Sequence, residues 1–235
     1  MAPVEMKVKS RPYDNAGRRT QSGDTRQRII EAARELMIER GYQATTVAAI
    51  ARTADVHVDT VYALVGRKPV LLRELIEQAL SGIDGAVVAE ERGYVEDIQA
   101  EPDPARKLNI YARAVRQIQS RMAPLFLALR DASVDEPDAT QVWREISERR
   151  AANMHKLARD LEAAGGLRGR LSIDEAADII WATNSSELYI LLTVERGWTP
   201  DHYERWLAET WCRLLLPDVP TRAEKPGAKP RSRLG

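Results

Sequence analysis

Apolar residues recur at intervals of three and four along most of this 235-residue chain, and glycine or proline separates one such stretch from the next. This period places the apolar side chains on one face of an α-helix. Ile29, Ile30, Ala33, Leu36 and Met37 show it first. No stretch of the sequence alternates apolar and polar residues as a half-buried strand does. The pattern therefore predicts an all-α protein.

Capping and helix-breaking residues predict where the helices begin and end. We expect the first helix to begin at Asp24 or Thr25, its N-cap, and to end at Gly41. A short helix should begin at the threonine pair 45–46, and a second short helix should run through Val65. Proline-containing residues 93–104 predict a loop. The later helices are expected at 69–80, 105–122, 124–133, 138–164, 173–196 and 200–216.

Composition divides the chain into four parts. Residues 1–24 have scattered basic residues and no apolar period, so we expect a disordered basic arm. Residues 25–75 contain the short helices, and residues 76–216 contain the longer ones. Residues 217–235 are basic and rich in proline, which predicts a disordered tail.

The formal net charge is zero, but the charges are unevenly distributed. Residues 1–75 have 13 Lys and Arg against 9 Asp and Glu, or +4. Residues 76–218 have 17 against 25, or −8, and residues 219–235 have 5 against 1, or +4. A basic segment joined to an acidic one favours a polyanion as the partner of the first. The alternative is that the positive segments have no binding role, because a chain of zero net charge with an acidic segment must also contain basic ones.

Several classes of protein are disfavoured by what the sequence lacks. The most apolar run, residues 188–194, is far shorter than the roughly 20 residues of a membrane-spanning helix. No signal peptide is recognisable and Cys212 is the sole cysteine, so we expect a cytoplasmic protein without disulfides. His57, His155 and His202 are far apart, and no nucleophile or phosphate-loop motif occurs. We therefore expect that the protein is not an enzyme and that it has no cofactor and no metal site.

Residues 54–69 carry polar side chains on a helix face that the core does not need. Val61, Leu64 and Val65 fall on one side of this short helix, and Asp59 and Ala63 fall on the other. A short helix, a tight turn and a second short helix form a helix-turn-helix, whose second helix can enter the DNA major groove. Hydroxyl and ammonium groups would contact phosphates. The predicted DNA contacts are Thr46, His57, Val58, Asp59, Thr60, Tyr62 and Lys68.

The stretch "TRQRIIEAARELMIERGYQATTVAAIARTADVHVDTVYALVGRKPVLLREL" resembles the N-terminal domain of tetracycline-repressor-like (TetR) transcriptional regulators. The order and spacing of "GYQATTV", "IARTADV", "TVY" and Lys68 carry the resemblance. Residues 171–216 also look like the last two helices of such regulators. The resemblance implies a three-helix DNA-binding domain, a homodimer, an effector cavity in a helical C-terminal domain, and release of DNA when the effector binds.

Three residues depart from the family pattern. Asp55 stands where a turn glycine is usual, so we expect it to adopt a left-handed conformation or to loosen the turn. His57 replaces a usual serine cap, and Val65 replaces a usual phenylalanine. A carboxylate at Asp59 facing DNA is repelled by phosphates unless it accepts from a cytosine, so a contact with the helix dipole is the preferred interpretation.

The C-terminal region has polar residues within its apolar helix faces. Arg150, Asn153 and Asn184 are of this kind, and buried polar groups need partners. A largely apolar cavity with a few polar groups would supply them in a ligand, although bonding to one another or exposure at a rim is an equal alternative. The predicted ligand contacts are Tyr111, Met122, Phe126, Trp143, Arg150, Asn153, Trp181 and Asn184.

The sequence thus predicts a DNA-binding regulator with residues 25–75 on DNA and residues 76–216 for dimerisation and effector binding. Two-fold symmetry would match a palindromic double-stranded operator, and repression is the default expectation. The alternative is a dimeric helical small-molecule-binding protein whose DNA-binding domain is vestigial. The sequence does not identify the effector or the operator.

Overall fold

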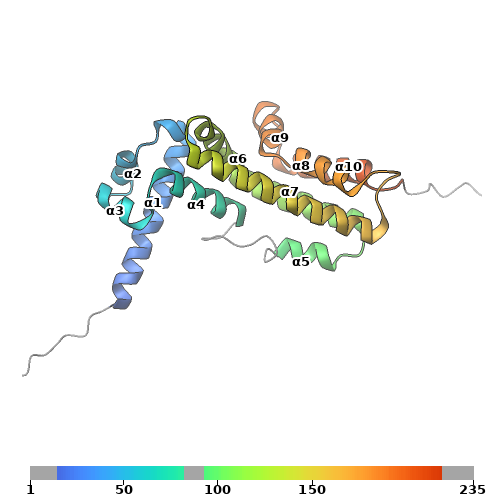
Figure 1. Cartoon of the computed structure of the whole chain (residues 1–235), viewed down its shortest axis with the longest axis horizontal. Coiled ribbons are helices and arrows are strands. Elements are labelled where there is room, and N and C mark those ends of the chain that lie inside the picture. Colours follow the sequence, from blue (N-terminus) through green and yellow to red (C-terminus); the bar gives the residue numbers. More distant parts are fainter. Residues whose placement is uncertain (1–14, 82–92, 219–235) are drawn as a thin grey trace, which may run out of the picture. The chain divides into compact units, whose positions relative to one another are not determined.

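The computed structural model describes residues 15–81 and 93–218, with side chains from residue 21 onward. These residues form helices and connecting turns, with no strand among them, as the apolar period predicts (Figure 1). The chain divides into two compact units. Of the described residues, unit 1 comprises 15–81 and 120–147, and unit 2 comprises 93–119 and 148–218.

The helices differ widely in length, from 5 to 32 residues. The first four are α1 (Asn15–Ala44), α2 (Val47–Thr53), α3 (Val58–Leu64) and α4 (Lys68–Ser81). The middle three are α5 (Gly93–Ala100), α6 (Pro104–Asp135) and α7 (Pro137–Gly165). The last are α8 (Ile173–Thr183), α9 (Ser186–Ile190), the π-helix η2 (Leu191–Glu195) and α10 (Pro200–Leu215). Helices α6 and α7 contribute residues to both units.

Helices α1 to α4 pack on one another around a shared apolar core in unit 1. The predicted inward stripe of α1 is confirmed, since Ile29, Ile30, Ala33, Leu36 and Met37 are all buried. Polar contacts fix the same helices from outside the core. Arg26 pairs with Glu74 at 2.6 Å, and Arg34 donates to Gln78 Oε1 at 2.9 Å.

The beginning of α1 differs from the prediction. The helix begins at Asn15 rather than at Asp24 or Thr25, so part of the predicted arm is helical. Backbone hydrogen bonds along a helix do not require an apolar face, and residues 15–24 contain no proline to stop the helix. Gly41 ends the regular stretch as predicted, with a φ of 78°. The remainder of the arm, residues 1–14, and the tail from 219 lie outside the described residues.

Two predictions based on proline were wrong. Helix α6 continues through Pro124 instead of ending there. Pro124 is exposed, so water can bond the carbonyl left without a donor, while the buried neighbours Met122 and Phe126 hold the helix on both sides. The predicted loop at 93–104 contains α5, because Ile98 is buried and the prolines follow the helix rather than interrupt it.

The predicted helix 173–196 is also wrong, because it is interrupted after Thr183. Ser185 caps α9 by accepting from the backbone N–H of Leu188 at 3.2 Å. Side chains from three other helices donate hydrogen bonds to the carbonyl oxygens at the end of α8. Arg150 donates to Trp181 O at 3.2 Å, Tyr203 to Thr183 O at 3.3 Å, and Gln119 to Asn184 O at 2.6 Å. These contacts satisfy the backbone at the break.

Within residues 15–81 and 93–218, every helix is too short or too polar to cross a membrane.

Candidate functional site

The turn between α2 and α3 is built from backbone hydrogen bonds and one unusual conformation. Thr46 caps α2, as predicted, by accepting from Ala49 N at 3.1 Å. Asp55 has a φ of 54°, so of the two expected outcomes, a left-handed conformation or a looser turn, the first is the one that occurs. Val56 N then donates to Ala51 O at 2.9 Å and closes the turn. His57 precedes α3 without a side-chain capping bond.

Helix α3 has one buried side and one exposed side. Val61 and Val65 face the core of unit 1 and are buried. Val58 is 38% exposed and Tyr62 is 50% exposed. The smaller or polar residues His57, Asp59 and Ala63 are exposed as well, and Thr60 is half-buried. The structure therefore brings the predicted DNA contacts from His57 to Tyr62 onto one short helix and its cap.

Lys68 has a structural partner at the beginning of α4. Its Nζ donates to the backbone oxygen of Tyr42 at 2.9 Å and lies 3.9 Å from the centre of the Tyr42 ring. Burial lowers the pKa of Lys68, and the nearby carboxylates Glu136 and Asp131 act in the opposite direction. Lys68 thus joins α4 to the end of α1, and its contact with a phosphate stays a prediction.

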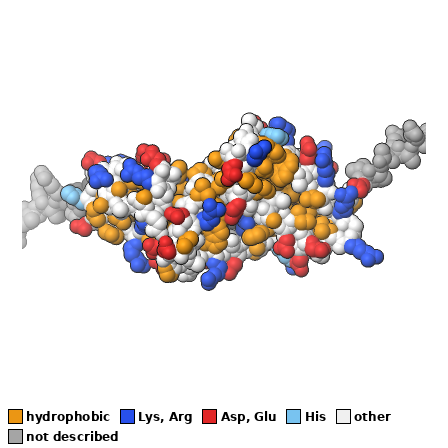
Figure 2. Space-filling view, turned by 90° about the horizontal axis from the view of Figure 1, so that it is seen from above, with side chains coloured by type: hydrophobic (Ala, Val, Ile, Leu, Met, Phe, Trp, Pro, Cys, Tyr) orange, Lys and Arg blue, Asp and Glu red, His pale blue; other side chains and the backbone are white. Residues whose placement is uncertain are grey.

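Two basic residues near α3 were missing from the predicted set. Arg52 is exposed in the last turn of α2, and Arg67 is exposed with Asp138 at 3.7 Å. Their positions at helix ends, on either side of α3, are the signal that could have identified them. Acidic and basic side chains are interspersed over the visible face of the molecule (Figure 2), so no single basic patch dominates that face.

Unit 2 contains a cavity of about 170 Å³ between α5, α6 and α7. Its lining is mostly apolar, and two of the lining residues, Tyr94 of α5 and Tyr111 of α6, have ring centres 6.1 Å apart. The cavity is lined by Tyr94, Val95, Ile98, Gln99, Tyr111, Asn153, Met154, Lys156, Leu157 and Asp160.

A buried polar cluster adjoins this cavity through Tyr111. Asn184 Nδ2 donates to Tyr111 Oη at 2.8 Å and lies 3.0 Å from Met154 Sδ. Tyr111 Oη in turn donates to Met154 Sδ at 3.1 Å. Burial raises the pKa of Tyr111 above any ordinary pH, so its hydroxyl stays protonated. The guanidinium of Arg150 lies 4.5 Å above the Trp181 ring.

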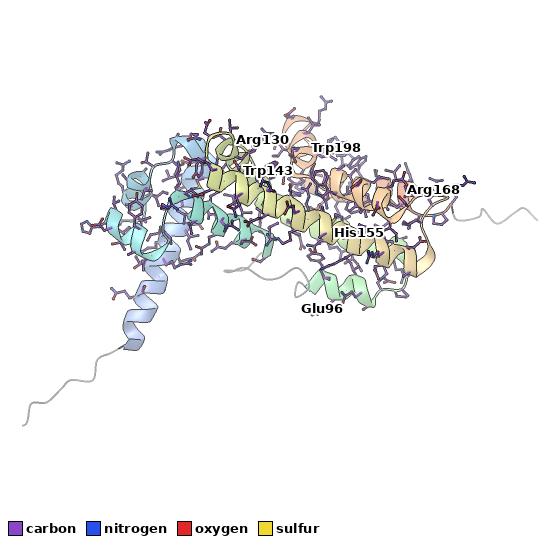
Figure 3. All side chains as sticks on the ribbon, in the orientation of Figure 1. Glu96, Arg130, Trp143, His155, Arg168 and Trp198 are labelled. Atoms are coloured by element: carbon purple, nitrogen blue, oxygen red, sulfur yellow. The ribbon has the colours of Figure 1, made fainter. Side chains whose placement is uncertain are left out.

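The predicted ligand contacts fall into two groups. Five of them lie in unit 2, with two lining the cavity and three in the cluster beside it: Tyr111, Asn153, Arg150, Trp181 and Asn184. The other three are the unit 1 residues Met122, Phe126 and Trp143. Trp143 on α7 (Figure 3) packs on Phe126 with ring centres 4.7 Å apart, and Met122 is buried.

Sequence reasoning missed the contribution of α5 to the cavity. Tyr94, Val95 and Ile98 line it, but their segment was predicted to be a loop. The spacing of these residues by one and four positions matches one face of a helix and could have identified them.

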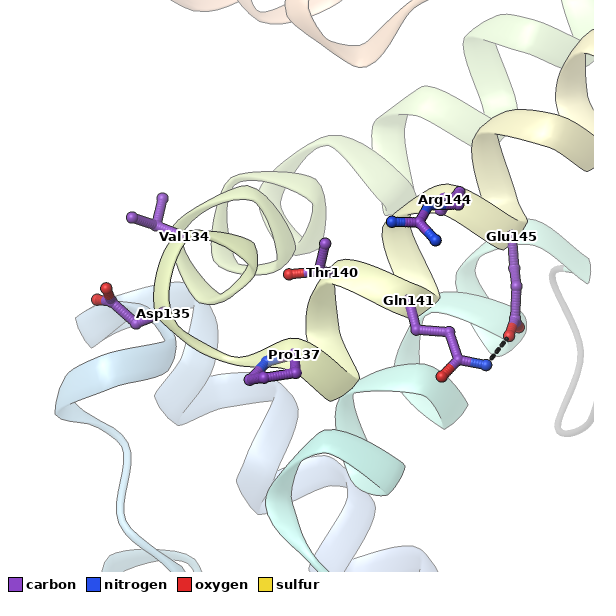
Figure 4. A pocket seen from close by; sticks show the side chains of 7 residues that line it. All are labelled: Val134, Asp135, Pro137, Thr140, Gln141, Arg144 and Glu145. Carbon is purple, nitrogen blue, oxygen red and sulfur yellow. Dashed lines mark hydrogen bonds between the residues drawn. The ribbon is translucent and has the colours of Figure 1, made fainter.

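A second hollow, of about 560 Å³, lies at the turn between α6 and α7 in unit 1 (Figure 4). Exposed side chains such as Val134, Asp135 and Arg144 line it, and Gln141 donates to Glu145 Oε1 at 2.8 Å. None of the predicted contacts lies there. Among the residues that the structure describes, no three His, Cys, Asp or Glu side chains are grouped to hold a metal ion.

Comparison with known proteins supports the assignment of the helix-turn-helix. The family model described as "Bacterial regulatory proteins, tetR family" matches residues 29–75, which hold the second half of α1, all of α2 and α3 and the first part of α4. No curated protein sequence matches the chain.

Solved structures of transcriptional regulators share the fold. NalD of Pseudomonas aeruginosa, the secondary repressor of the MexAB-OprM multidrug efflux pump, is 21% identical with a TM-score of 0.65, over 85% of this chain and 100% of its own. A putative transcriptional regulator from Saccharomonospora viridis in complex with choline is 20% identical with a TM-score of 0.63, over 82% and 98%. SmeT in complex with triclosan is 16% identical with a TM-score of 0.65, over 88% and 100%. The chain therefore carries a segment, residues 29–75, that matches the model of the tetR family of bacterial regulatory proteins, and it shares its overall fold with these transcriptional regulators.

Proposed function

We propose that this protein is a DNA-binding transcriptional repressor that acts as a homodimer on a palindromic operator and is released by a small molecule. The exposed face of α3, with Tyr62 half-exposed at its centre, is the observation that carries the proposal. A helix with a buried apolar side and an exposed polar side can enter a major groove without disturbing its own core.

The DNA contacts that we propose divide by chemistry. Thr46, Thr60, Tyr62 and Lys68 would bond phosphates and fix the register of the protein on the duplex. Val58 and the small Ala63, which is not in the predicted set, let the backbone approach base edges. His57 would contact phosphate when protonated. Asp59 stays the least favourable contact, and its position in the first turn suits the α3 dipole.

The structure weakens one argument for a vestigial DNA-binding domain. Asp55 adopts the left-handed conformation that the family's turn glycine would supply, so the turn closes without glycine. We therefore favour the regulator over a dimer that only binds small molecules.

Binding of the full chain to fragments of its own upstream region at two salt concentrations tests the proposal. A dimer that neutralises several phosphates should lose affinity by orders of magnitude between about 50 and 200 mM salt. Absence of binding to every fragment at low salt would overturn the proposal.

The change Tyr62→Phe tests the phosphate role of the α3 hydroxyl. We expect affinity to fall about fivefold for all DNA sequences alike, because a hydrogen bond to phosphate carries no base information. Tyr42→Phe is the matched control, since Tyr42 lies in the same unit and is fully buried. A change in base preference in the Tyr62 variant, or an equal loss in the control, would contradict the assignment.

A further inference from the structure

The interior of unit 2 holds hydrogen-bond donors without oxygen acceptors. Arg150 Nε and Trp181 Nε1 are buried and have no hydrogen-bond partner. Tyr111 Oη directs its hydrogen toward Met154 Sδ, and a thioether sulfur is a weak acceptor. Asn184 Nδ2 has Tyr111 Oη as its oxygen acceptor and directs its other hydrogen toward the same sulfur. In the same cluster Asn184 Oδ1 has no donor. Unpaired buried donors are costly, so this cluster favours a ligand that supplies oxygen atoms.

Arg150 forms no ion pair within 4 Å among the described residues, and the carboxylate that acts on its charge, Glu187, does so from a longer distance. Of the buried or half-buried Lys and Arg side chains described in unit 2, Lys107, Arg116 and Arg168 each pair with a carboxylate. Arg150 instead donates to the backbone oxygen of Trp181 and stacks on its ring. The carboxyl end of α8 offsets only part of a full positive charge. Burial lowers the pKa of Arg150, but an arginine remains charged at neutral pH.

The cavity beside this cluster has the size of one aromatic ring. Its volume is about 170 Å³, and an apolar cavity of about 150 Å³ is known to hold benzene. Val95, Ile98 and Leu157 provide apolar walls, and the rings of Tyr94 and Tyr111 stand at one side. A single six-membered ring with a small substituent fits this space.

The acidic residue in the cavity wall does not favour a cation. Asp160 is the one acidic residue among the lining side chains that the structure describes. Lys107 Nζ lies 2.8 Å from Asp160 Oδ2 and also donates to Ile98 O at 2.5 Å. Since Lys107 is almost fully buried, this pair is already neutral, and a cationic ligand would find no unpaired carboxylate there.

We propose that this cavity binds a monocyclic aromatic carboxylate whose oxygen atoms accept a hydrogen bond from Tyr111 and lie in the field of Arg150. The inference deepens the proposed function, in which unit 2 senses a small molecule. Tyr111 lines the cavity and is also bonded to Asn184 in the buried cluster, where the positive charge of Arg150 opposes the rise in the pKa of Tyr111. The hydroxyl would exchange the sulfur of Met154 for a charged oxygen, which is the stronger acceptor.

Calorimetric titration of the full chain at pH 7 with benzoate, benzamide and benzyltrimethylammonium tests the inference. We expect benzoate to bind at least about tenfold more tightly than its neutral analogue benzamide, because the hydrogen bonds to it are charge-assisted. We expect the cation to bind more weakly than either. Equal affinity for benzoate and benzamide, a preference for the cation, or no binding of benzoate at millimolar concentration would overturn the inference.

Variants of Arg150 and Tyr111 test whether these two side chains cause the preference for benzoate over benzamide. Arg150→Gln should remove the preference for benzoate over benzamide, whereas Arg159→Gln, exposed on the same helix, should keep it. Tyr111→Phe should weaken benzoate binding about fivefold and leave benzamide binding less affected. If circular dichroism shows that Arg150→Gln does not fold, Tyr111→Phe and the charge-preserving Arg150→Lys decide the question. A folded Arg150→Gln or Tyr111→Phe variant with the wild-type preference overturns the inference, as does a folded Arg150→Lys variant without any preference.

These titrations contain no DNA, so they separate the inference from the proposed function. If the protein bound benzoate selectively but bound no DNA fragment, the proposed regulatory function would be wrong and the proposed ligand class would stand. If the protein bound DNA but did not distinguish the three probes, the proposed ligand class would be wrong and the proposed regulatory function would stand.

Discussion

Asp55 shows how one residue can preserve a turn without having the ideal chemistry for it. Its φ of 54° is a conformation that glycine adopts freely and that other residues adopt at a cost. Two backbone hydrogen bonds, from Asp55 N to Arg52 O and from Val56 N to Ala51 O, hold the turn in this shape. The choice of aspartate therefore affects stability more than the placement of α3.

Asp55→Gly should raise the free energy of unfolding by about 0.5 kcal/mol. Relief of the left-handed conformation is expected to exceed the additional entropy of glycine in the unfolded chain. Urea unfolding measures the change, with Asp55→Ala as a control that should lower stability. A less stable glycine variant would show that the aspartate side chain contributes more to the turn than its conformation costs.

Tyr42 gives a pH-dependent prediction. Its hydroxyl is buried without a hydrogen-bond partner, and burial, followed by Glu136 and Asp138, raises its pKa from 10.0 to about 12. Because the pKa of Tyr42 is higher in the folded protein than in the unfolded chain, folding favours the protonated hydroxyl. This contribution to the free energy of unfolding is complete below pH 10 and is lost as the pH rises toward 12. Tyr42→Phe should be neutral or stabilising by up to about 1 kcal/mol at pH 7.

The advantage of Tyr42→Phe should grow by roughly 1 kcal/mol between pH 9 and pH 11, because phenylalanine does not ionise in the unfolded chain. Urea unfolding of both proteins across this range is the measurement. A difference that stays constant with pH would contradict the pKa assigned to Tyr42.

At the scale of elements, the interruption between α8 and α9 is the least expected feature. Residues 173–196 have apolar side chains suited to a continuous helix, yet the helix stops after Thr183. Gln119 joins the two sides, because it donates to Asn184 O at 2.6 Å and accepts from Ser186 Oγ at 2.7 Å. All three residues are buried, so the network replaces the helical bonds that are missing there.

Gln119→Leu should lower the free energy of unfolding by about 2 kcal/mol. The change leaves the carbonyl of Asn184 and the hydroxyl of Ser186 buried without these partners. Gln117→Leu, two residues away and exposed, is the control and should change stability little. Thermal and urea unfolding of the two variants give the comparison. Equal stabilities would mean that the network does not hold the interruption.

At the scale of the whole molecule, unit 2 leaves apolar side chains exposed that a second protein chain could cover. Val194 is 72% exposed and Leu191 is 46% exposed on η2. Exposed apolar side chains grouped on one element favour association. In the proposed homodimer, which the last helices would form, they would be covered by a second copy of the chain.

Val194→Asp should raise the dissociation constant of the homodimer by about tenfold or more, because it would bury an unpaired carboxylate. DNA affinity should fall with it, since two copies are needed for a palindrome. Sedimentation equilibrium measures the first effect. Val134→Asp, at a valine that is 78% exposed in unit 1, is the matched control. The same dissociation constant in both variants would place the dimer contact elsewhere.

The sequence by itself determined the helical class, the buried stripe of α1, the cap at Thr46 and the exposed face of α3. These features depend on neighbours within about one or two helical turns, and the residues concerned are close together in the chain. The turn at Asp55 was predictable for the same reason. Most predictions that failed involved helix ends, where proline and hydroxyl signals compete with burial, as at Pro124 and Ile98.

Only the tertiary structure decided which polar residues of the C-terminal region meet. It brought Tyr111, Met154 and Asn184 into contact from three helices, and it placed Trp143 with Phe126 in the other unit. It also made α8 end where Arg150, Gln119 and Tyr203 can donate hydrogen bonds to the carbonyl oxygens at the break. Such contacts join residues tens of positions apart, so they depend on how whole helices pack, which no local pattern encodes.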